Sequence, residues 1–187
     1  MPKLLPLAPE PLTAPTDRDM LPSERREFVR THRTCVFGYE RRHDGPAMSV
    51  VYYLPTDDDE LLVSTMAGRG KARAVSRNPK VSLCVLDERW PFTYLQVYAD
   101  AVVDTDTDLV IDVMMAVAAR MSGQELGEEA RPVVAAMAAD EERIVLRCRP
   151  YATFAQPPRH LHRNDQTEIV THWVSAALPW DEADTSS

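Results

Sequence analysis

Residues 64–85 read STMAGRGKARAVSRNPKVSLCV, and this stretch decides the fold. It predicts a strand ending at Thr65, a turn with two glycines, a short basic helix from Lys71 to Arg77, and a second strand from Val81. It carries no acidic residue and five cations: Arg69, Lys71, Arg73, Arg77 and Lys80. The whole chain of 187 residues has a formal net charge of -8. Cations concentrated against that background predict an anion-binding site, although runs of charge are more often a solvated surface.

The start of the basic helix is where we expect the anion. The first backbone N–H groups of a helix have no helical acceptor, and the helix dipole is positive there, so phosphate binds well. A guanidinium binds phosphate through two parallel hydrogen bonds, and a lysine adds a point charge. Arg69 and Lys71 are therefore the expected ligands, whereas Arg73, Arg77 and Lys80 are expected to be surface or helix-end charges.

The rest of the chain alternates short apolar segments with turns. We expect a first helix with Ser23 as its N-cap, and strands at residues 34–39, 48–54, 61–65, 81–86, 93–103 and 143–154. After Thr107 the apolar residues recur at helical spacing, which predicts one helix ended by Gly123 and another at about 128–139. Strands first and helices inserted late predict a mainly β fold of the α+β class, an antiparallel barrel or sheet with helices at its ends.

The length fits one folded domain with extensions at both ends. We expect a flexible N-terminal arm at residues 1–21, the folded domain at 22–156 and a C-terminal tail at 157–187. The tail carries an apolar patch that includes Trp173 and Trp180. This patch either packs loosely on the surface or covers a cofactor site and excludes water from it.

Composition argues against several classes of function. An acidic chain is unsuited to general nucleic-acid binding. No segment is long and apolar enough to cross a membrane. At the N-terminus, prolines interrupt the apolar residues before they reach the length of a signal peptide. Cys35, Cys84 and Cys148 lie in apolar, strand-like segments without a C-x-x-C pair, so we expect buried free thiols and a cytoplasmic protein. His160-x-His162 has no further ligand at a suitable spacing, so we expect no metal site.

Three motifs of residues 64–85 resemble a known superfamily. Ser64-Thr65, Arg69-x-Lys71 and Arg77-Asn-Pro-Lys-Val81 leading into a strand are similar to the pyridoxamine 5'-phosphate oxidase-like proteins, whose fold is an FMN-binding-protein-like split β-barrel. The resemblance runs from about residue 22 to about residue 156 and is closest to the branch that uses the deazaflavin coenzyme F420. It implies a homodimer with two cofactor sites across the interface.

The resemblance also implies roles for individual residues. The residues around the cofactor would be Arg69, Lys71 and the backbone of Ala72 at the phosphate, Ser64 and Thr65 at the flavin or deazaflavin ring, Met48, Ser49 and Tyr52 on the strand beside the ring, and Trp90 and Tyr94 near the partner's cofactor. Val50 and Tyr52 depart from the family, which often has amide side chains at these places on the strand. Without the resemblance, Tyr52 would be read as a core residue, and Trp90 with Tyr94 as a pair packed at a turn.

These observations define the expected function. No nucleophile with an adjacent base and no pair of carboxylates stands out, and a cofactor that carries hydride itself needs only binding, orientation and water exclusion. We expect an oxidoreductase that reduces a small organic substrate by hydride transfer from reduced F420, with Arg25, Arg26 and Arg30 of the first helix meeting the acidic tail of the coenzyme. Two alternatives remain open: an FMN-dependent oxidase or reductase of the same fold, and a non-catalytic carrier of a flavin or deazaflavin.

Overall fold

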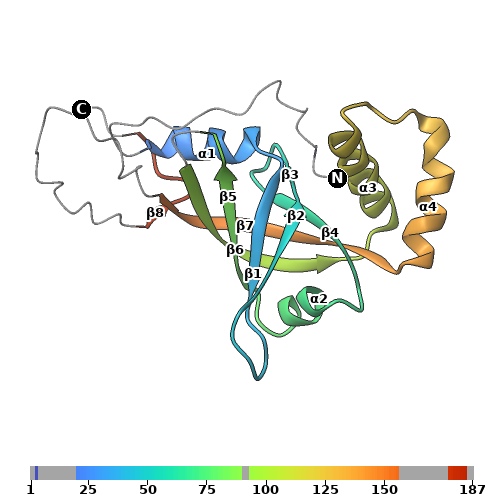
Figure 1. Ribbon diagram of the computed structural model, residues 1–187, viewed down its shortest axis with the longest axis horizontal. Coiled ribbons are helices and arrows are strands. Elements are labelled where there is room, and N and C mark those ends of the chain that lie inside the picture. Colours follow the sequence, from blue (N-terminus) through green and yellow to red (C-terminus); the bar gives the residue numbers. More distant parts are fainter. Residues whose placement is uncertain (1–2, 4–19, 90–92, 156–176, 185–187) are drawn as a thin grey trace, which may run out of the picture.

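One curled antiparallel sheet forms the body of the protein in a computed structural model that describes residues 3, 20–89, 93–155 and 177–184 (Figure 1). Its strands are β1 (Thr34–Tyr39), β2 (Ala47–Tyr52), β3 (Leu54–Pro55), β4 (Leu61–Met66), β5 (Lys80–Asp87), β6 (Thr93–Asp104), β7 (Arg143–Ala155) and β8 (Leu178–Pro179). Their order in space is β2-β1-β5-β6-β7-β4-β3, with β8 paired to β7. All these pairs are antiparallel, which confirms the predicted kind of sheet.

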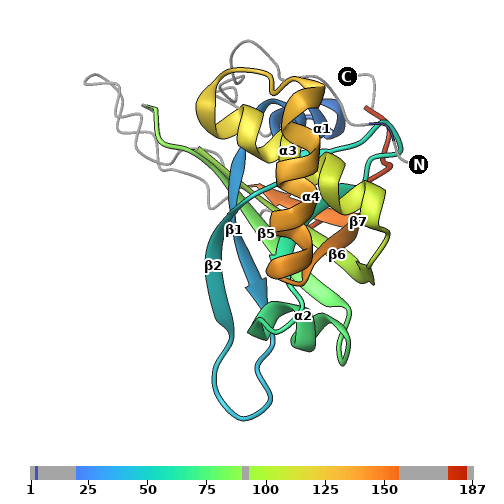
Figure 2. The ribbon, with the colours of Figure 1, turned by 90° about the vertical axis from the view of Figure 1, so that its right-hand side faces the viewer.

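The helices lie at the ends and side of this sheet. They are α1 (Pro22–Thr31), α2 (Gly70–Val75), α3 (Thr107–Ser122), the short 3-10 helix η1 (Glu128–Ala130) and α4 (Arg131–Asp140). Figure 1 shows α1 across one end of the strands and α2 near the opposite end, and Figure 2 shows α3 and α4 packed together on one side. The carboxylate of Asp106 accepts a hydrogen bond from the backbone N–H of Leu109 at 2.8 Å, and Gly123 ends α3 with a φ of 73°, as its position predicted.

The curled sheet separates two apolar clusters, because successive side chains of a strand point to opposite faces. The inner cluster lies between the curled strands and α1 and includes Phe28, Phe37, Val63, Leu83, Val97 and Leu146. The second cluster lies between the sheet and the pair α3 and α4, and includes Leu54, Leu62, Leu109, Val113 and Val145. Strand β4 is therefore buried on both faces at its start, which explains its uninterrupted apolar sequence.

Helix α1 begins two residues earlier than the sequence predicted. Its first residue is Pro22, whose fixed φ suits the first position of a helix. Leu21 takes the N-cap position, and its N–H donates to the carboxylate of Glu24 at 2.8 Å. Ser23 is not the cap; its N–H and hydroxyl donate instead to the carboxylate of Asp184, at 2.9 and 2.6 Å.

The three arginines of α1 hold the chain together, and the expectation that they face a coenzyme is wrong. Arg25 is buried, with 3% of its surface exposed, and all three side chains have partners within the protein. These partners are Thr153 for Arg25, the backbone carbonyls of Trp180 and Glu182 for Arg26, and Asp59 for Arg30. These groups lie far from α1 in the sequence, so the helix alone gave no sign of them.

Residues 177–184 of the C-terminal tail pack on the folded domain. Strand β8 pairs with β7, with Leu178 opposite Thr153 and Pro179 opposite Ala152. Trp180 is 7% exposed and belongs to the inner apolar cluster. This part of the tail therefore contributes to the core of its own chain, while Trp173 lies outside the described residues.

Adjacent tyrosines at the end of β2 give a stability test. Tyr53 is fully buried, and its hydroxyl donates to the backbone carbonyl of Val29 at 2.6 Å, which ties α1 to the sheet. Tyr53→Phe leaves that carbonyl without its buried donor, so the free energy of unfolding should fall by about 1–3 kcal/mol in urea denaturation. Tyr52→Phe is the control, because no hydrogen bond of the Tyr52 hydroxyl occurs among the described residues, and it should change stability by less than about 0.5 kcal/mol. Equal effects of both variants would contradict the assignment.

Candidate functional site at the gap between β2 and β4

The curl of the sheet brings its two ends together. Strand β2 lies at one end of the spatial order and β4 lies next to the other, yet the two strands are in contact. Helix α2 follows β4 and packs against β1, β4 and β6. The residues that the motifs pointed to, on β2, β4 and α2, are therefore neighbours across this gap.

Two buried hydroxyl groups at the gap lack hydrogen-bond partners. The Oγ atoms of Ser49 on β2 and Ser64 on β4 are both inaccessible to solvent, and neither forms a hydrogen bond within the described part of the chain. Buried polar atoms are paired in the great majority of cases, so an unpaired pair on neighbouring strands requires an explanation. Both serines were predicted to line a cofactor, and both are available to hydrogen-bond one.

Ser64 and Thr65 lie on opposite faces of β4, since the side chains of a strand alternate. Ser64 shares the face of Leu62, which packs toward α3 and α4. Thr65 shares the face of Val63, which belongs to the inner cluster, and is 5% exposed. The two hydroxyls therefore project from opposite sides of β4, so they can contact different parts of a ligand but cannot both contact one face of it.

Lys71 is the most unusual charge of the site. Its ammonium group is half-buried, and no hydrogen bond or ion pair to it occurs among the described residues. Burial lowers the pKa of Lys71, the positive charge of Arg69 lowers it further, and the nearby thiol of Cys35 acts in the opposite direction. A partly desolvated cation beside a second cation is unfavourable, and a bound anion would relieve the cost.

The surroundings of Lys71 leave room for such an anion. Arg69 is exposed, and the one hydrogen bond of its side chain to a described residue runs from Nε to the sulfur of Met66, at 3.4 Å. The backbone N–H of Ala72, in the first turn of α2, has no acceptor within the helix. Gly70 lies against Tyr39, because a Cβ at that position would be 3.0 Å from the tyrosine hydroxyl. Sequence reasoning missed Tyr39, since only the packing of α2 on β1 brings it to the site.

Met48 lies on the face of β2 that points away from Ser49. It is 73% exposed, and Val50 on the same face is 74% exposed, whereas Tyr52 further along is half-buried. Ser49 lies opposite Phe37 and shares the inner face of the sheet with Val51, whereas Met48 lies on the outer surface. From the sequence we expected Met48 and Ser49 to lie together beside the ring, but the alternation of the strand places their side chains on two different surfaces.

An open groove of about 770 Å³ runs along this outer surface, from the β1–β2 loop to β7. It is lined by residues that include Gly38, Met48, Ser82, Tyr98 and Tyr151. The rings of Tyr98 and Tyr151 stack with centroids 6.4 Å apart, and the ammonium of Lys80 lies 4.3 Å from the centre of the Tyr151 ring. Tyr94 shares the face of Tyr98 on β6 and is half-buried, whereas Trp90 lies outside the described residues.

The remaining charges and thiols have structural roles or lie at the surface. Arg73 and Arg77 are exposed, and Lys80 pairs with Asp100, as expected. Cys35, Cys84 and Cys148 are free thiols, and burial raises the pKa of each. Within the described ranges, no three His, Cys, Asp or Glu side chains are grouped to hold a metal ion, and no helix is long and apolar enough to span a membrane.

Comparisons with known structures show the fold. A conserved hypothetical protein from Mycobacterium tuberculosis aligns with a TM-score of 0.66 and 22% identity, over 79% of this chain and 91% of the other. An F420 reductase aligns with a TM-score of 0.51 and 20% identity, over 65% and 88%. A heme binding protein from Mycobacterium smegmatis aligns with a TM-score of 0.53 and 13% identity, over 87% and 59%.

No curated protein sequence matches the chain. The family model described as pyridoxamine 5'-phosphate oxidase matches residues 21–157. Together with the curled antiparallel sheet and its flanking helices, this match confirms the predicted α+β split barrel. The chain belongs to the pyridoxamine 5'-phosphate oxidase family.

Proposed function

We propose that this protein is an oxidoreductase that binds a phosphate-bearing flavin or deazaflavin at the gap between β2 and β4, and that reduced F420 is the coenzyme from which its small organic substrate receives hydride. The observation that carries the proposal is the set of unsatisfied groups at the gap. Lys71 has no counter-ion there, and the buried hydroxyls of Ser49 and Ser64 have no hydrogen-bond partner. A ligand with an anionic end and a polar ring satisfies both requirements.

The residues divide into an anionic and a ring side. Lys71, Arg69 and the backbone N–H of Ala72 would hold the phosphate at the start of α2. The hydroxyls of Ser49, Ser64 and Thr65 would bind the polar atoms of the ring. Met48, Tyr52, Trp90 and Tyr94 would shield a ring from water at the partner's site. The coenzyme supplies the hydride chemistry when bound, so the protein supplies binding, orientation and water exclusion.

Two features support F420 over FMN. The Arg-x-Lys and Asn-Pro-Lys-Val motifs resemble the F420 branch, and a protein described as an F420 reductase shares the fold. The arginines of α1 give no further support, since they are engaged within the protein. FMN stays the alternative coenzyme, because a phosphate end would meet the same cations.

A carrier without catalytic activity is the second candidate function. It is favoured by Val50, which places an apolar, 74% exposed side chain where relatives often have an amide that contacts the ring. Turnover separates the two functions. An oxidoreductase oxidises the reduced coenzyme in the presence of substrate, whereas a carrier binds it and leaves its absorbance unchanged.

We also propose that the protein acts as a homodimer through the outer face of the sheet. Among the described elements, no helix covers the face of β2, β5 and β6 that carries Val50, Met48 and Tyr98. An exposed apolar area of this kind marks an interaction surface. Symmetric dimers are the commonest oligomers, and a second copy would bring Tyr94 near the partner's coenzyme.

Replacement of Lys71 tests the phosphate site. Lys71→Ala removes the half-buried cation, and loss of one charge-assisted hydrogen bond costs about 1.5–3 kcal/mol, so the dissociation constant of F420 or FMN should rise by about tenfold or more. The fold should be unaffected, because the ammonium has no partner among the described residues. Titration followed by coenzyme absorbance or fluorescence measures the change.

Arg77→Ala is the matched control. Arg77 belongs to the same basic segment, but it is exposed and donates only to the backbone carbonyl of Arg73, at 2.8 Å. Its loss should leave the affinity within about twofold of the unchanged protein. Equal affinities of the Lys71→Ala variant and the unchanged protein would rule out the phosphate site at α2.

The lowered pKa of Lys71 predicts a pH dependence of binding. Lys71 must be protonated to bind phosphate, so the affinity should fall as the pH rises through the pKa of Lys71 in the free protein, which lies below its ordinary 10.5. Lys71→Arg keeps its charge in this range and should remove the alkaline decline. Coenzyme titrations from about pH 7 to pH 10 measure the difference between the two proteins, which cancels any titration of the coenzyme itself. Parallel curves would contradict the role of the lysine.

A charged substitution on the outer face tests the dimer. Val50→Asp should weaken dimerisation by about tenfold or more, because burying an unpaired carboxylate at an interface is unfavourable. Val133→Asp is the control, since Val133 is 63% exposed on α4, away from this face. Light scattering over a dilution series should report a dimer for the unchanged protein and for Val133→Asp, and monomers for Val50→Asp. A monomeric unchanged protein would exclude a shared cofactor site.

A further inference from the structure

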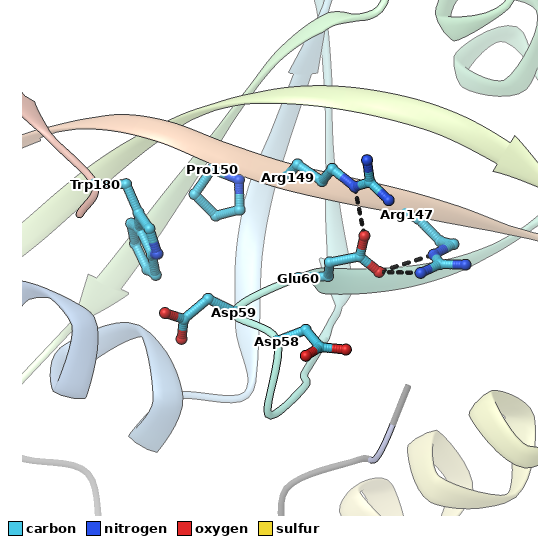
Figure 3. A pocket seen from close by; sticks show the side chains of 7 residues that line it. All are labelled: Asp58, Asp59, Glu60, Arg147, Arg149, Pro150 and Trp180. Carbon is cyan, nitrogen blue, oxygen red and sulfur yellow. Dashed lines mark hydrogen bonds and ion pairs between the residues drawn. The ribbon is translucent and has the colours of Figure 1, made fainter. Parts of the chain in front are cut away.

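A second pocket lies at the other end of β4 from α2. Its volume is about 340 Å³, and it is bounded by residues 58–60 of the turn before β4, by residues 147–150 of β7, and by Trp180 after β8 (Figure 3). Strand β4 runs from this turn to Met66, a path of about 20 Å at the usual rise per residue. The pocket is therefore separate from the gap at Lys71, and its size suits a small molecule.

The indole N–H of Trp180 is an unsatisfied donor at this pocket. The side chain is 7% exposed, and its Nε1 is inaccessible to solvent and has no hydrogen-bond partner among the described residues. Figure 3 shows the indole on one side of the pocket, with its nitrogen on the edge that faces Pro150 and Glu60. A buried tryptophan usually finds an acceptor for its N–H, so the pocket lacks an acceptor that a ligand could bring.

Glu60 fixes two guanidinium groups at the opposite wall. Its carboxylate is 6% exposed and accepts from Arg147 at 2.6 and 2.8 Å and from Nε of Arg149 at 2.6 Å. The side chain of Arg149 is 68% exposed, and its two terminal nitrogens have no partner among the described residues. They are held in place and are free to bind a carboxylate through two hydrogen bonds.

Carboxylates of the turn before β4 supply hydrogen-bond acceptors to the pocket. Asp58 is exposed and its carboxylate bonds to no described residue, while Asp59 binds Arg30 through Oδ1 alone. The pocket is thus lined by three carboxylates and two guanidiniums, a formal net charge of -1. The net charge disfavours a simple anion, and a simple cation would leave the indole N–H without an acceptor.

We propose that this pocket binds a small zwitterion of the size and kind of a free amino acid, with its carboxylate at Arg149 and the indole N–H of Trp180 and its ammonium at Asp58 and Asp59. This ligand supplies an acceptor to the indole N–H and a cation to the unpaired carboxylate of Asp58, which neither a lone anion nor a lone cation does. The site is independent of the coenzyme function proposed above, and binding at each can be measured without the other.

Thermal shift and calorimetry on the full-length protein test the proposal. The probes are the individual L-amino acids, with propionate and propylamine as ligands that carry only one of the two charges. At least one amino acid should raise the melting temperature and bind with a stoichiometry of one, and both single-charge probes should bind about tenfold more weakly or worse. Failure of every amino acid to bind at millimolar concentration, or propionate binding as tightly as the best amino acid, would overturn the proposal.

Two variants identify the pocket as the place of binding. Trp180→Phe retains the ring in the core and removes the N–H, and Asp58→Asn removes an exposed charge without disturbing the fold. Each should weaken binding of the best amino acid by about tenfold. Asp57→Asn is the matched control, because the neighbouring Asp57 is exposed and does not line the pocket, and it should bind normally. If Asp58→Asn binds as tightly as Asp57→Asn, the assignment is wrong, whatever the stability of the tryptophan variant.

Discussion

The pairing of β6 with β7 is the constraint on which the rest of the structure depends, and one extra residue in β7 changes the register of this pairing. Ala99 pairs with Pro150 and Tyr98 with Ala152, so Tyr151 is a bulge that opposes no residue of β6. Before the bulge Ile144, Leu146 and Cys148 face the inner core; beyond it Thr153 and Ala155 are the buried residues, so the alternation has shifted by one. Both halves of the longest strand therefore bury their apolar faces while the sheet bends. Proline is tolerated beside a bulge because the hydrogen-bond ladder is interrupted there and does not need the N–H that proline lacks.

The same extra residue shapes two surfaces. The ring of Tyr151 lies in the outer groove, where it stacks on Tyr98 and contacts the ammonium of Lys80. The backbone carbonyl of Tyr151 accepts a hydrogen bond from the backbone N–H of Trp180 at 3.1 Å. The bulge thus supplies an aromatic wall to the exposed face of the sheet and an anchor for the returning C-terminal segment. Since Trp180 closes the pocket next to Pro150, one local irregularity positions parts of the molecule on both sides of the sheet.

The sequence predicted what depends on neighbours along the chain and missed what depends on pairing across it. The strands, α3 with its stop at Gly123, and the continuous unit from Ser64 to Lys71 follow from periodicity and turn residues, which are local signals. Within the candidate site, Ser64, Thr65, Arg69 and Lys71 are close in space because they are close in the sequence. Ser49 and Tyr39 reach the site only when the sheet curls and α2 docks on β1. The arginines of α1 were misinterpreted for the same reason, because their partners lie elsewhere in the chain. Thr153 and Trp180, which bind Arg25 and Arg26, are more than a hundred residues away, and Asp59, which binds Arg30, is 29 residues away. Pro150 was the only local sign of the bulge, and one proline inside a strand does not state which way the alternation will shift.

The electrostatics of the chain distinguish charges that stabilise the fold from charges held for a ligand. Arg25, Arg26, Arg147 and Arg131 each satisfy carbonyls or carboxylates, so each helps to join segments distant in sequence. Lys71 differs, because it is partly desolvated and its pKa is lowered by burial and by Arg69. Such a lysine destabilises the empty protein, and a purely structural requirement would be met better by an apolar residue at the same position. Unsatisfied groups persist in a protein where surrounding structure tolerates their cost, and they concentrate at binding sites. The cost at Lys71 is therefore consistent with a binding energy recovered only when an anion arrives. This makes the gap between β2 and β4 a stronger candidate for the coenzyme site than the open groove outside it.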